Sequence, residues 1–275
     1  MGDALFTPGG IVTLTTDFGT SDGYVGAMKG VILGRAPGVA IHDVAHEVAP
    51  QNVAHGAAVM RTACPWFPPG SVHVGVVDPG VGTERAPVVL LAGGHIFVGP
   101  DNGLCSLATE ALGGLDEARR IDQAGALAAA LPGVTSATFH GRDVFAPTAA
   151  VLASGHISPA DVGPLHDPLT LPAAKPRTLE GEVRGRVTHV DRFGNAITDI
   201  AAADLAGRPA AAYAARVHDR DVDLVRTYAD VDEGTACALV GSEGFVEIAV
   251  RGGNAAALLG IAARAEVRMR RKAPA

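Results

Sequence analysis

Acidic residues end three of the apolar, β-branched runs in the first part of the chain. Asp17 follows "GIVTLTT", Asp43 follows "VAIH", and Asp78 follows "SVHVGVV". In open α/β sheets, the groups that contact ligands lie just beyond the carboxyl ends of the strands. A carboxylate in that position can accept hydrogen bonds from two hydroxyl groups at once, as a ribose diol requires. We therefore expect Asp17 to contact a ribose.

Asp22 lies close to Asp17, at the start of a predicted helix. Two interpretations remain open for it. Asp22 contacts a ligand together with Asp17, or Asp22 or Ser21 is simply the N-cap of the helix, a position that Ser and Asp favour. Asp17 itself precedes the helix by too much to cap it.

The stretch "VVDPGVGTER" places Asp78 at a strand end and Arg85 after a glycine turn. The two side chains could pair, and the arginine would then keep the carboxylate ionised and oriented. Taken alone, this pattern is better explained as an ion pair that braces a turn. The glycines do not match GxGxxG and no Walker lysine follows them, so a phosphate-binding loop is not supported.

His140 stands in "TFHGRDVFAP", a loop that opens into a helix, beside Arg142 and Asp143. A neutral histidine next to an Asp–Arg pair would be able to orient and deprotonate a water molecule. The alternative is a loop histidine whose hydrogen bonds are satisfied locally.

The stretch "HVDRFGNAITDI" carries Asp191, Phe193 and Asn195 at alternate positions. On a strand these side chains would face the same way. They would then contact an ammonium group, stack on a base and hydrogen-bond to its edge. The alternative is a turn over "RFGN" with Asn195 in a left-handed conformation. Further on, Ser242 and the pair Asn254-Ala255 by themselves indicate a turn and the start of a helix.

The elements that must position these residues follow two different patterns along the chain. The first half predicts strands and helices in alternation, which implies an α/β fold with a mostly parallel sheet between two layers of helices. Strands are expected over 10–17, 39–48, 71–78, 86–93 and 95–102, and helices over 23–36, 52–67, 103–112, 123–130 and 139–155.

After a proline-rich stretch the predicted elements are short strands of alternating polarity with Gly and Asp turns, which is typical of a small barrel or sandwich. We therefore predict a three-layer α/β domain over 1–165, a linker over 166–179, and a smaller all-β, barrel-like domain over 180–275.

Composition excludes several classes of protein. The chain has 275 residues, 48% of them hydrophobic, and a net charge of -7, which argues against nucleic-acid or anionic-membrane binding. The three cysteines show no CxxC spacing, and no histidine pair matches HExxH or HxxEH, so a metal-dependent hydrolase is not supported. Because the chain has neither a signal-peptide pattern nor an apolar run long enough to span a bilayer, we expect a cytoplasmic protein. Since no metal-ligand motif is present, we also expect it to use neither a metal nor a cofactor.

Six motifs, in this order, resemble one family. They are "TTDFGTSDGYVGAMKG", "VHVGVVDPGVGTERAP", "FVGPDNGL", "TFHGRDVFAP", "VDRFGNAITDI" and "GFVEIAVRGGNAA". The family is the S-adenosylmethionine hydrolases, which form adenosine and L-methionine and are related to fluorinating and chlorinating enzymes that use the same substrate. The resemblance extends from about 11 to 259.

The resemblance implies a homotrimer in which each active site lies between the N-terminal domain of one subunit and the C-terminal domain of its neighbour. It also implies that Asp78, Arg85 and His140 position the attacking water. The binding residues that it implies are Asp17 for the ribose hydroxyls, Asp191 for the methionine ammonium, Phe193 and Asn195 for the adenine face, Asn254 and Ala255 for the adenine edge, and Ser242 for the methionine end.

The implied chemistry needs no acid, because a sulfonium is already an excellent leaving group. It needs a dry pocket that holds water in line with the ribose C5′, opposite sulfur. The resemblance implies water rather than a halide as the nucleophile, because the chain retains the His140 and Gly141 of the hydrolytic branch. Glu243, beside Ser242, would repel a methionine carboxylate and should point away or alter that contact. A halogenase, and a module that binds adenosine or S-adenosylmethionine without reacting, are the alternatives.

Overall fold

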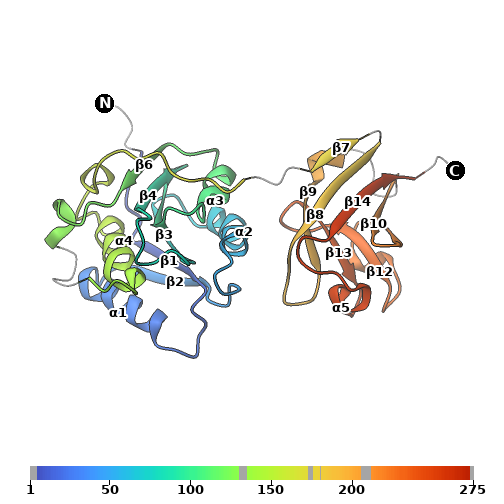
Figure 1. The fold of residues 1–275 in the computed structure, drawn as a ribbon, viewed down its shortest axis with the longest axis horizontal. Helices are drawn as coiled ribbons and strands as arrows, with labels where there is room; N and C mark the ends of the chain where they lie inside the picture. Colours follow the sequence, from blue (N-terminus) through green and yellow to red (C-terminus); the bar gives the residue numbers. More distant parts are fainter. Residues whose placement is uncertain (1–4, 130–134, 173–175, 180, 206–211, 273–275) are drawn as a thin grey trace. The chain divides into compact units, whose positions relative to one another are not determined.

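The computed structural model describes residues 5–129, 135–172, 176–179, 181–205 and 212–272. Contacts divide the chain into two compact units, Met1–Leu171 and Pro172–Ala275 (Figure 1). We call them the N-terminal and the C-terminal unit and describe each by itself. The predicted domain boundaries at 165 and 180 stay predictions. In the described residues, no helix combines the length and the apolar character that crossing a membrane requires.

A six-stranded sheet forms the centre of the N-terminal unit. Its strands are β1 (Ile11–Thr16), β2 (Ala40–Ala45), β3 (Ser71–Val76), β4 (Pro87–Ala92), β5 (His95–Pro100) and β6 (Glu117–Arg120). The order is β2-β1-β3-β5-β4-β6. The pairs β1–β2, β1–β3 and β3–β5 are parallel, whereas β4 is antiparallel to both its neighbours. The mostly parallel sheet is therefore confirmed.

Helices cover both faces of this sheet. They are α1 (Tyr24–Arg35), α2 (Val53–Ala63), α3 (Ser106–Ala111) and α4 (Ala146–Ala153). Helices α1 and α4 pack on one face, and their buried Met28, Ile32 and Leu152 share a core with Val12 and Leu14. Helices α2 and α3 pack on the other face (Figure 1), where a second core contains residues of both helices and of β4. Two cores on opposite faces confirm the three-layer α/β architecture.

Three local features differ from the expectation. The strands β4 and β5 form a hairpin, because Gly93 and Gly94 both adopt positive φ angles and reverse the chain. Strand β6 is short and charged, so it carried no strand pattern. The helix expected over 123–130 is, in the described residues, a 3₁₀ turn at Ala126–Ala129.

The C-terminal unit is an antiparallel sheet that nearly closes into a barrel. Its strands are β7 (Arg177–Leu179), β8 (Glu182–Val190), β9 (Ala196–Ala201), β10 (Tyr213–Val217), β11 (Arg220–Asp223), β12 (Ala236–Val240), β13 (Phe245–Val250) and β14 (Glu266–Arg271). The order is β11-β10-β14-β8-β9-β13-β12, with β7 paired to β8. A bridge between Leu224, after β11, and Ala238 in β12 brings the two edges together. The barrel-like all-β domain is confirmed, and it also contains α5 (Ala255–Leu259).

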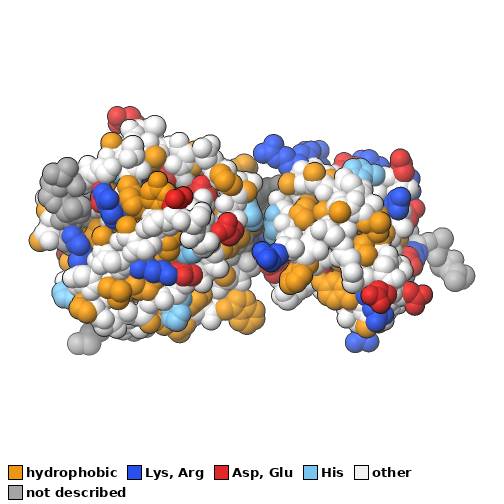
Figure 2. All heavy atoms as spheres, turned by 90° about the horizontal axis from the view of Figure 1, so that it is seen from below, with side chains coloured by type: hydrophobic (Ala, Val, Ile, Leu, Met, Phe, Trp, Pro, Cys, Tyr) orange, Lys and Arg blue, Asp and Glu red, His pale blue; other side chains and the backbone are white. Residues whose placement is uncertain are grey.

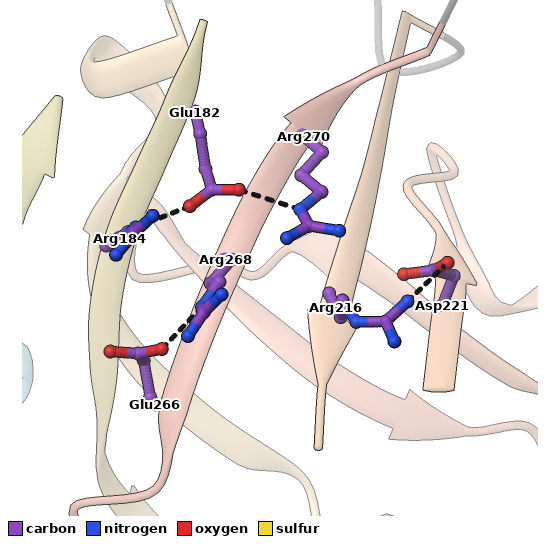
Figure 3. Close-up of polar contacts among 7 residues, drawn as sticks. All are labelled: Glu182, Arg184, Arg216, Asp221, Glu266, Arg268 and Arg270. Carbon is purple, nitrogen blue, oxygen red and sulfur yellow. Dashed lines mark hydrogen bonds and ion pairs between the residues drawn. The ribbon is translucent and has the colours of Figure 1, made fainter. Parts of the chain in front are cut away.

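Ion pairs cover one face of β8, β14, β10 and β11 (Figure 3). Glu182 accepts from Arg184 at 2.5 Å and from Arg270 at 2.7 Å, so it bridges two strands. Further pairs are Glu266–Arg268, Arg216–Asp221 and Lys272–Asp223. Most of these side chains are partly exposed, and exposed pairs contribute little to stability. This face is a solvated exterior.

The first part of the proline-rich stretch is fixed to the N-terminal unit. His166 Nε2 lies 2.8 Å from Asp101 Oδ2, and Leu169 N donates to Asp101 Oδ1 at 2.8 Å. Leu171 N donates to Ser106 Oγ at 3.1 Å. Asp101 follows β5 directly, so the end of a central strand holds this segment.

Candidate active site

Asp17 is the first residue beyond the buried strand β1 and is half-buried itself. Its Oδ2 accepts a hydrogen bond from Gln51 N at 2.8 Å. Gln51 belongs to the loop between β2 and α2 and has a positive φ of 60°, unusual for a residue with a side chain. The carboxylate of Asp17 therefore ties two loops together at the carboxyl edge of the sheet, which is where a ligand is expected.

Asp22 is exposed and does not cap the following helix. The N-cap of α1 is Gly23, and no side chain accepts a hydrogen bond there. The capping interpretation of Asp22 or Ser21 is therefore wrong. The contact of Asp22 with a ligand stays a prediction.

Asp78 and Arg85 form a bidentate ion pair. Arg85 Nε donates to Asp78 Oδ1 at 2.9 Å, and Arg85 Nη2 donates to Asp78 Oδ2. Their side chains are only 5% and 10% exposed, so the pair is largely withdrawn from water. In the turn between them, Gly82 has a φ of 79°, and a Cβ there would lie 2.8 Å from Ala137 O. Glycine thus lets this turn approach the loop that precedes His140.

His140 completes the cluster through Arg85. Arg85 Nη2 lies 2.9 Å from His140 Nδ1. Because a guanidinium only donates hydrogen bonds, Nδ1 must be the acceptor, which places the ring proton of the neutral imidazole on Nε2. Burial lowers the pKa of His140, the charge of Arg85 lowers it further, and Asp78 and Asp143 oppose both effects. His140 is therefore a neutral ring at pH 7 and, in this geometry, a donor at Nε2.

One donor of Arg85 is left over. Among the described residues, Arg85 Nη1 is buried and has no hydrogen-bond partner. The guanidinium also lies over the Phe145 ring, 5.3 Å from its centroid. A buried N–H without an acceptor costs about 1–3 kcal/mol, so an oxygen of a water or a substrate would stabilise the cluster here.

Arg142 and Asp143 pair with each other, not with His140. Arg142 Nε donates to Asp143 Oδ1 at 2.6 Å, and Ser136 N donates to Asp143 Oδ2 at 2.8 Å. The hydrogen bond from Arg142 lowers the pKa of Asp143, against a smaller opposing effect of burial. Asp143 therefore fixes the start of the loop that carries His140.

Sequence reasoning missed an aromatic cluster beside this loop. The rings of Phe18, Tyr24 and Phe139 meet with centroids 5.3–5.9 Å apart. A Cβ on Gly141 would lie 3.3 Å from Phe139 and 3.5 Å from Phe18. Aromatic residues are only 4% of the chain, and the position of each of these three beside a site motif was the available signal.

In the C-terminal unit, Asp191 and Phe193 lie in a turn between β8 and β9. Asp191 Oδ1 accepts from Phe193 N at 2.9 Å and from Asn195 N at 2.8 Å, and Oδ2 accepts from Asn195 Nδ2 at 3.1 Å. The expectation of three side chains on one strand face is wrong, because the carboxylate captures these N–H groups and turns the chain. The turn interpretation is right, but Gly194, with φ 86°, takes the left-handed conformation instead of Asn195.

The same turn lies against the start of α5. Asn254 caps this helix by accepting from Ala257 N at 2.8 Å, and Ala256 N donates to Gly194 O at 2.9 Å. A Cβ on Gly194 would lie 2.1 Å from the Asn254 side chain. The structure therefore brings the turn at 191–195 together with Asn254 and the buried Ala255, while the Phe193 side chain is 75% exposed.

Ser242 lies in the exposed turn between β12 and β13, next to the exposed Glu243. Sequence reasoning missed Glu247 behind this turn. Glu247 is 7% exposed and accepts a hydrogen bond from the Tyr228 hydroxyl. Burial and the nearby charge of Asp191 raise the pKa of Glu247. The signal was a single acid in the apolar strand "FVEIAV".

Comparison with known proteins shows the family of the chain. The model of the SAM hydroxide adenosyltransferase N-terminal domain matches residues 12–163, and the model of the corresponding C-terminal domain matches residues 185–268. The chain belongs to this family.

Several members and relatives are similar over nearly their full length. A protein of Salinispora arenicola named (R)-S-adenosyl-L-methionine hydrolase is 43% identical, over 91% of this chain and 94% of its own. The protein of that name from Thermus thermophilus is 42% identical, over 94% and 98%. A fluorinase of Actinoplanes sp. is 29% identical, over 87% and 90%. The crystal structure of an uncharacterized conserved protein from Thermotoga maritima superposes with a TM-score of 0.87, at 35% identity, over 95% of this chain and all of that one.

Proposed function

We propose that this protein hydrolyses S-adenosyl-L-methionine to adenosine and L-methionine. The observation that carries the proposal is the partly buried cluster of Asp78, Arg85 and a neutral His140 at the carboxyl edge of the sheet. The names of the hydrolase relatives, at 42–43% identity, support the substrate. Their (R) designation further suggests a preference for one sulfonium epimer.

In the proposed reaction, the oxygen of a water molecule attacks the ribose C5′. The bond between C5′ and sulfur breaks, its electron pair stays on sulfur as the thioether of methionine, and one proton is released. The sulfonium needs no acid to leave. The protein must therefore orient the water, exclude other water, and accept the proton.

The geometry suggests a division of these roles. Arg85 Nη1 or the Nε2–H of His140 would donate to one lone pair of the water oxygen, which leaves the other lone pair to attack C5′. Arginine stays protonated, and the Nδ1 lone pair of His140 is engaged by Arg85. Asp78 is the member of the cluster whose carboxylate retains lone pairs, so we assign the proton to it.

The binding roles follow the two halves of the site. Asp17, with Asp22 nearby, would hold the ribose hydroxyls. In the C-terminal unit, Asp191 would meet the methionine ammonium and Ser242 the methionine end, while Phe193, Asn195, Asn254 and Ala255 would enclose the adenine. We propose that a homotrimer assembles each site from two subunits. Light scattering should give three times the mass of one chain, and a mixture of Asp78→Ala and Asn195→Ala chains should regain activity through mixed trimers. Failure to regain activity would argue against sites shared between subunits.

The direct test incubates the pure protein with each sulfonium epimer and separates the products by chromatography. We expect adenosine and methionine in equal amounts. A 5′-halo-5′-deoxyadenosine that forms only with added halide would instead identify a halogenase, which the fluorinase relatives make the second candidate. Adenosine binding without any product would identify a binding module.

A further inference from the structure

We propose that His46 is a positioning residue that sets the orientation of Asp17 and thereby the affinity for the ribose. This inference rests on the proposed function, because it concerns the same site. His46 lies just after β2 and is 7% exposed. It has no contact role in the reaction described above.

One edge of the His46 ring fixes the residues on both sides of Asp17. His46 Nδ1 lies 2.9 Å from Thr16 Oγ1, and the same oxygen accepts from Phe18 N at 3.3 Å. The backbone of His46 acts too, because its carbonyl accepts from Gly19 N at 2.8 Å. The backbone that carries Asp17 is therefore held immediately before and after that residue.

The other edge of the ring faces a charged pair. His46 Nε2 lies 3.0 Å from Asp43 Oδ1, which is within ion-pair distance but does not meet the geometry of a hydrogen bond. Asp43 Oδ2 accepts a hydrogen bond from Lys29 Nζ at 2.6 Å. Burial raises the pKa of Asp43, but the interactions with Lys29 and His46 together outweigh burial and lower it. An ionised Asp43 favours the proton on Nε2, so Nδ1 accepts from the Thr16 hydroxyl.

The segment after His46 adds two further ties to the Asp17 loop. Gln51 N donates to Asp17 Oδ2 at 2.8 Å, and Thr20 Oγ1 donates to Glu47 Oε1 at 3.2 Å. The series of contacts from Lys29 in α1 through Asp43 to His46 thus holds the backbone that carries the Asp17 carboxylate. Loss of the ring would let that carboxylate rotate away from a ribose.

The same strand offers a matched control. Thr13 Oγ1 lies 2.8 Å from His73 Nδ1, and both residues are fully buried. This second Thr–His hydrogen bond joins the middle of β1 to β3 and does not involve the Asp17 loop. Thr13→Val and Thr16→Val therefore each remove one buried hydroxyl from β1, but only Thr16→Val loosens Asp17.

The test measures adenosine binding by calorimetry and steady-state hydrolysis for the full chain. For Thr16→Val and His46→Ala we expect the Kd for adenosine and the KM to rise together by about three- to tenfold, a part of what one hydrogen bond to a charged group supplies. The kcat should change by less than about twofold, because the ribose contact is the same in ground and transition state. His46→Asn, whose amide occupies the place of Nδ1, should recover most of the affinity.

Thr13→Val should lower the melting temperature as much as Thr16→Val does and leave Kd and KM unchanged. Equal Kd values for the two threonine variants would overturn the inference, and so would a fall in kcat at constant KM. If His46→Ala does not fold, the nearly isosteric Thr16→Val and His46→Asn decide. A wild type that binds adenosine without hydrolysis refutes the proposed function but leaves the positioning role testable, whereas a wild type that neither binds adenosine nor hydrolyses S-adenosyl-L-methionine refutes both.

Discussion

The two halves of the proposed site are built by different means. In the N-terminal unit, Arg85 joins Asp78, seven residues away in the same loop, to His140, 55 residues away in a different segment. In the C-terminal unit, Asp191 and Asn254 form their hydrogen bonds to residues at most four positions further on. The first half depends on the packing of the whole unit, and the second on the geometry of one turn and one helix cap.

The two units also differ in charge. Met1–Leu171 holds fifteen acidic and seven basic residues, whereas Pro172–Ala275 holds fourteen acidic and fifteen basic ones. The substrate of the proposed reaction carries a sulfonium and an ammonium, and an acidic N-terminal unit suits a cation. Figure 2 shows acidic, basic and apolar side chains interspersed over the face that it draws, so the charge on that face is spread out.

The largest effect is expected from substitutions in the N-terminal cluster of Asp78, Arg85 and His140, the half that long-range contacts assemble. Asp78→Ala and His140→Ala should each lower kcat by about 10²–10⁴-fold, because each removes a group that orients or deprotonates the water. Calorimetry should still detect adenosine binding, since the ribose and adenine contacts remain. Wild-type turnover in both variants would refute the assignment of the cluster.

The corresponding change in the local half should act on affinity. Asp191→Ala removes an acceptor of three hydrogen bonds and the proposed partner of the ammonium. We expect KM to rise by roughly 10- to 100-fold, as for a lost hydrogen bond to a charged group, with a smaller change in kcat. Asp221→Ala, which breaks one exposed ion pair in the same unit, is the control and should leave KM unchanged. A fall in kcat alone would contradict the division of roles.

Acid should change the stability of the two units in opposite directions. Burial and the neighbouring His95 lower the pKa of His73 to about 3, so below pH 6.5 the unfolded N-terminal unit binds a proton that the folded unit does not. From pH 7 to 5 His73 alone should lower the stability of this unit by about 2 kcal/mol, and the lowered pKa values of His55, His95 and His140 act in the same direction. Burial raises the pKa of Glu247, so the folded C-terminal unit binds the extra proton and acid stabilises it.

Hydrogen exchange of the full chain at both pH values, resolved by peptide, checks these opposite signs. His73→Gln, which does not titrate, should reduce the loss in the N-terminal unit by about the contribution of His73. A decline of equal size in both units, unchanged in His73→Gln, would show that these two groups do not control the response.

The smallest expected effect sharpens the description of the turn. Gly194→Ala places a Cβ at a φ of 86° and against Asn254, whereas Gly260→Ala, with φ 67°, meets no atom within 4 Å. Both should destabilise the C-terminal unit by about 1 kcal/mol through backbone strain. Only Gly194→Ala should also weaken adenosine binding, because it displaces the Asn254 cap. Equal affinities would separate the turn from the adenine site.

The sequence predicted most of the fold because periodicity and turn residues mark long buried elements well. It missed β6, where four largely charged residues gave no strand pattern, and it left open whether Asp191 lies on a strand or beside a turn. The carboxylate of Asp191 accepts hydrogen bonds that reverse the chain there. A pattern of alternating polar and apolar residues does not reveal such hydrogen bonds. The Asp78–Arg85 pair was predictable from its spacing, whereas the role of His46 required the contact between the ends of β1 and β2.

The most direct test of the central claim is hydrolysis of S-adenosylmethionine in water enriched in oxygen-18, followed by mass spectrometry of the products. If water attacks C5′, the heavy oxygen must appear in the 5′-hydroxyl of adenosine and not in methionine, and Asp78→Ala must lose this product. Adenosine without the label, or label incorporation that does not depend on Asp78, would contradict the account.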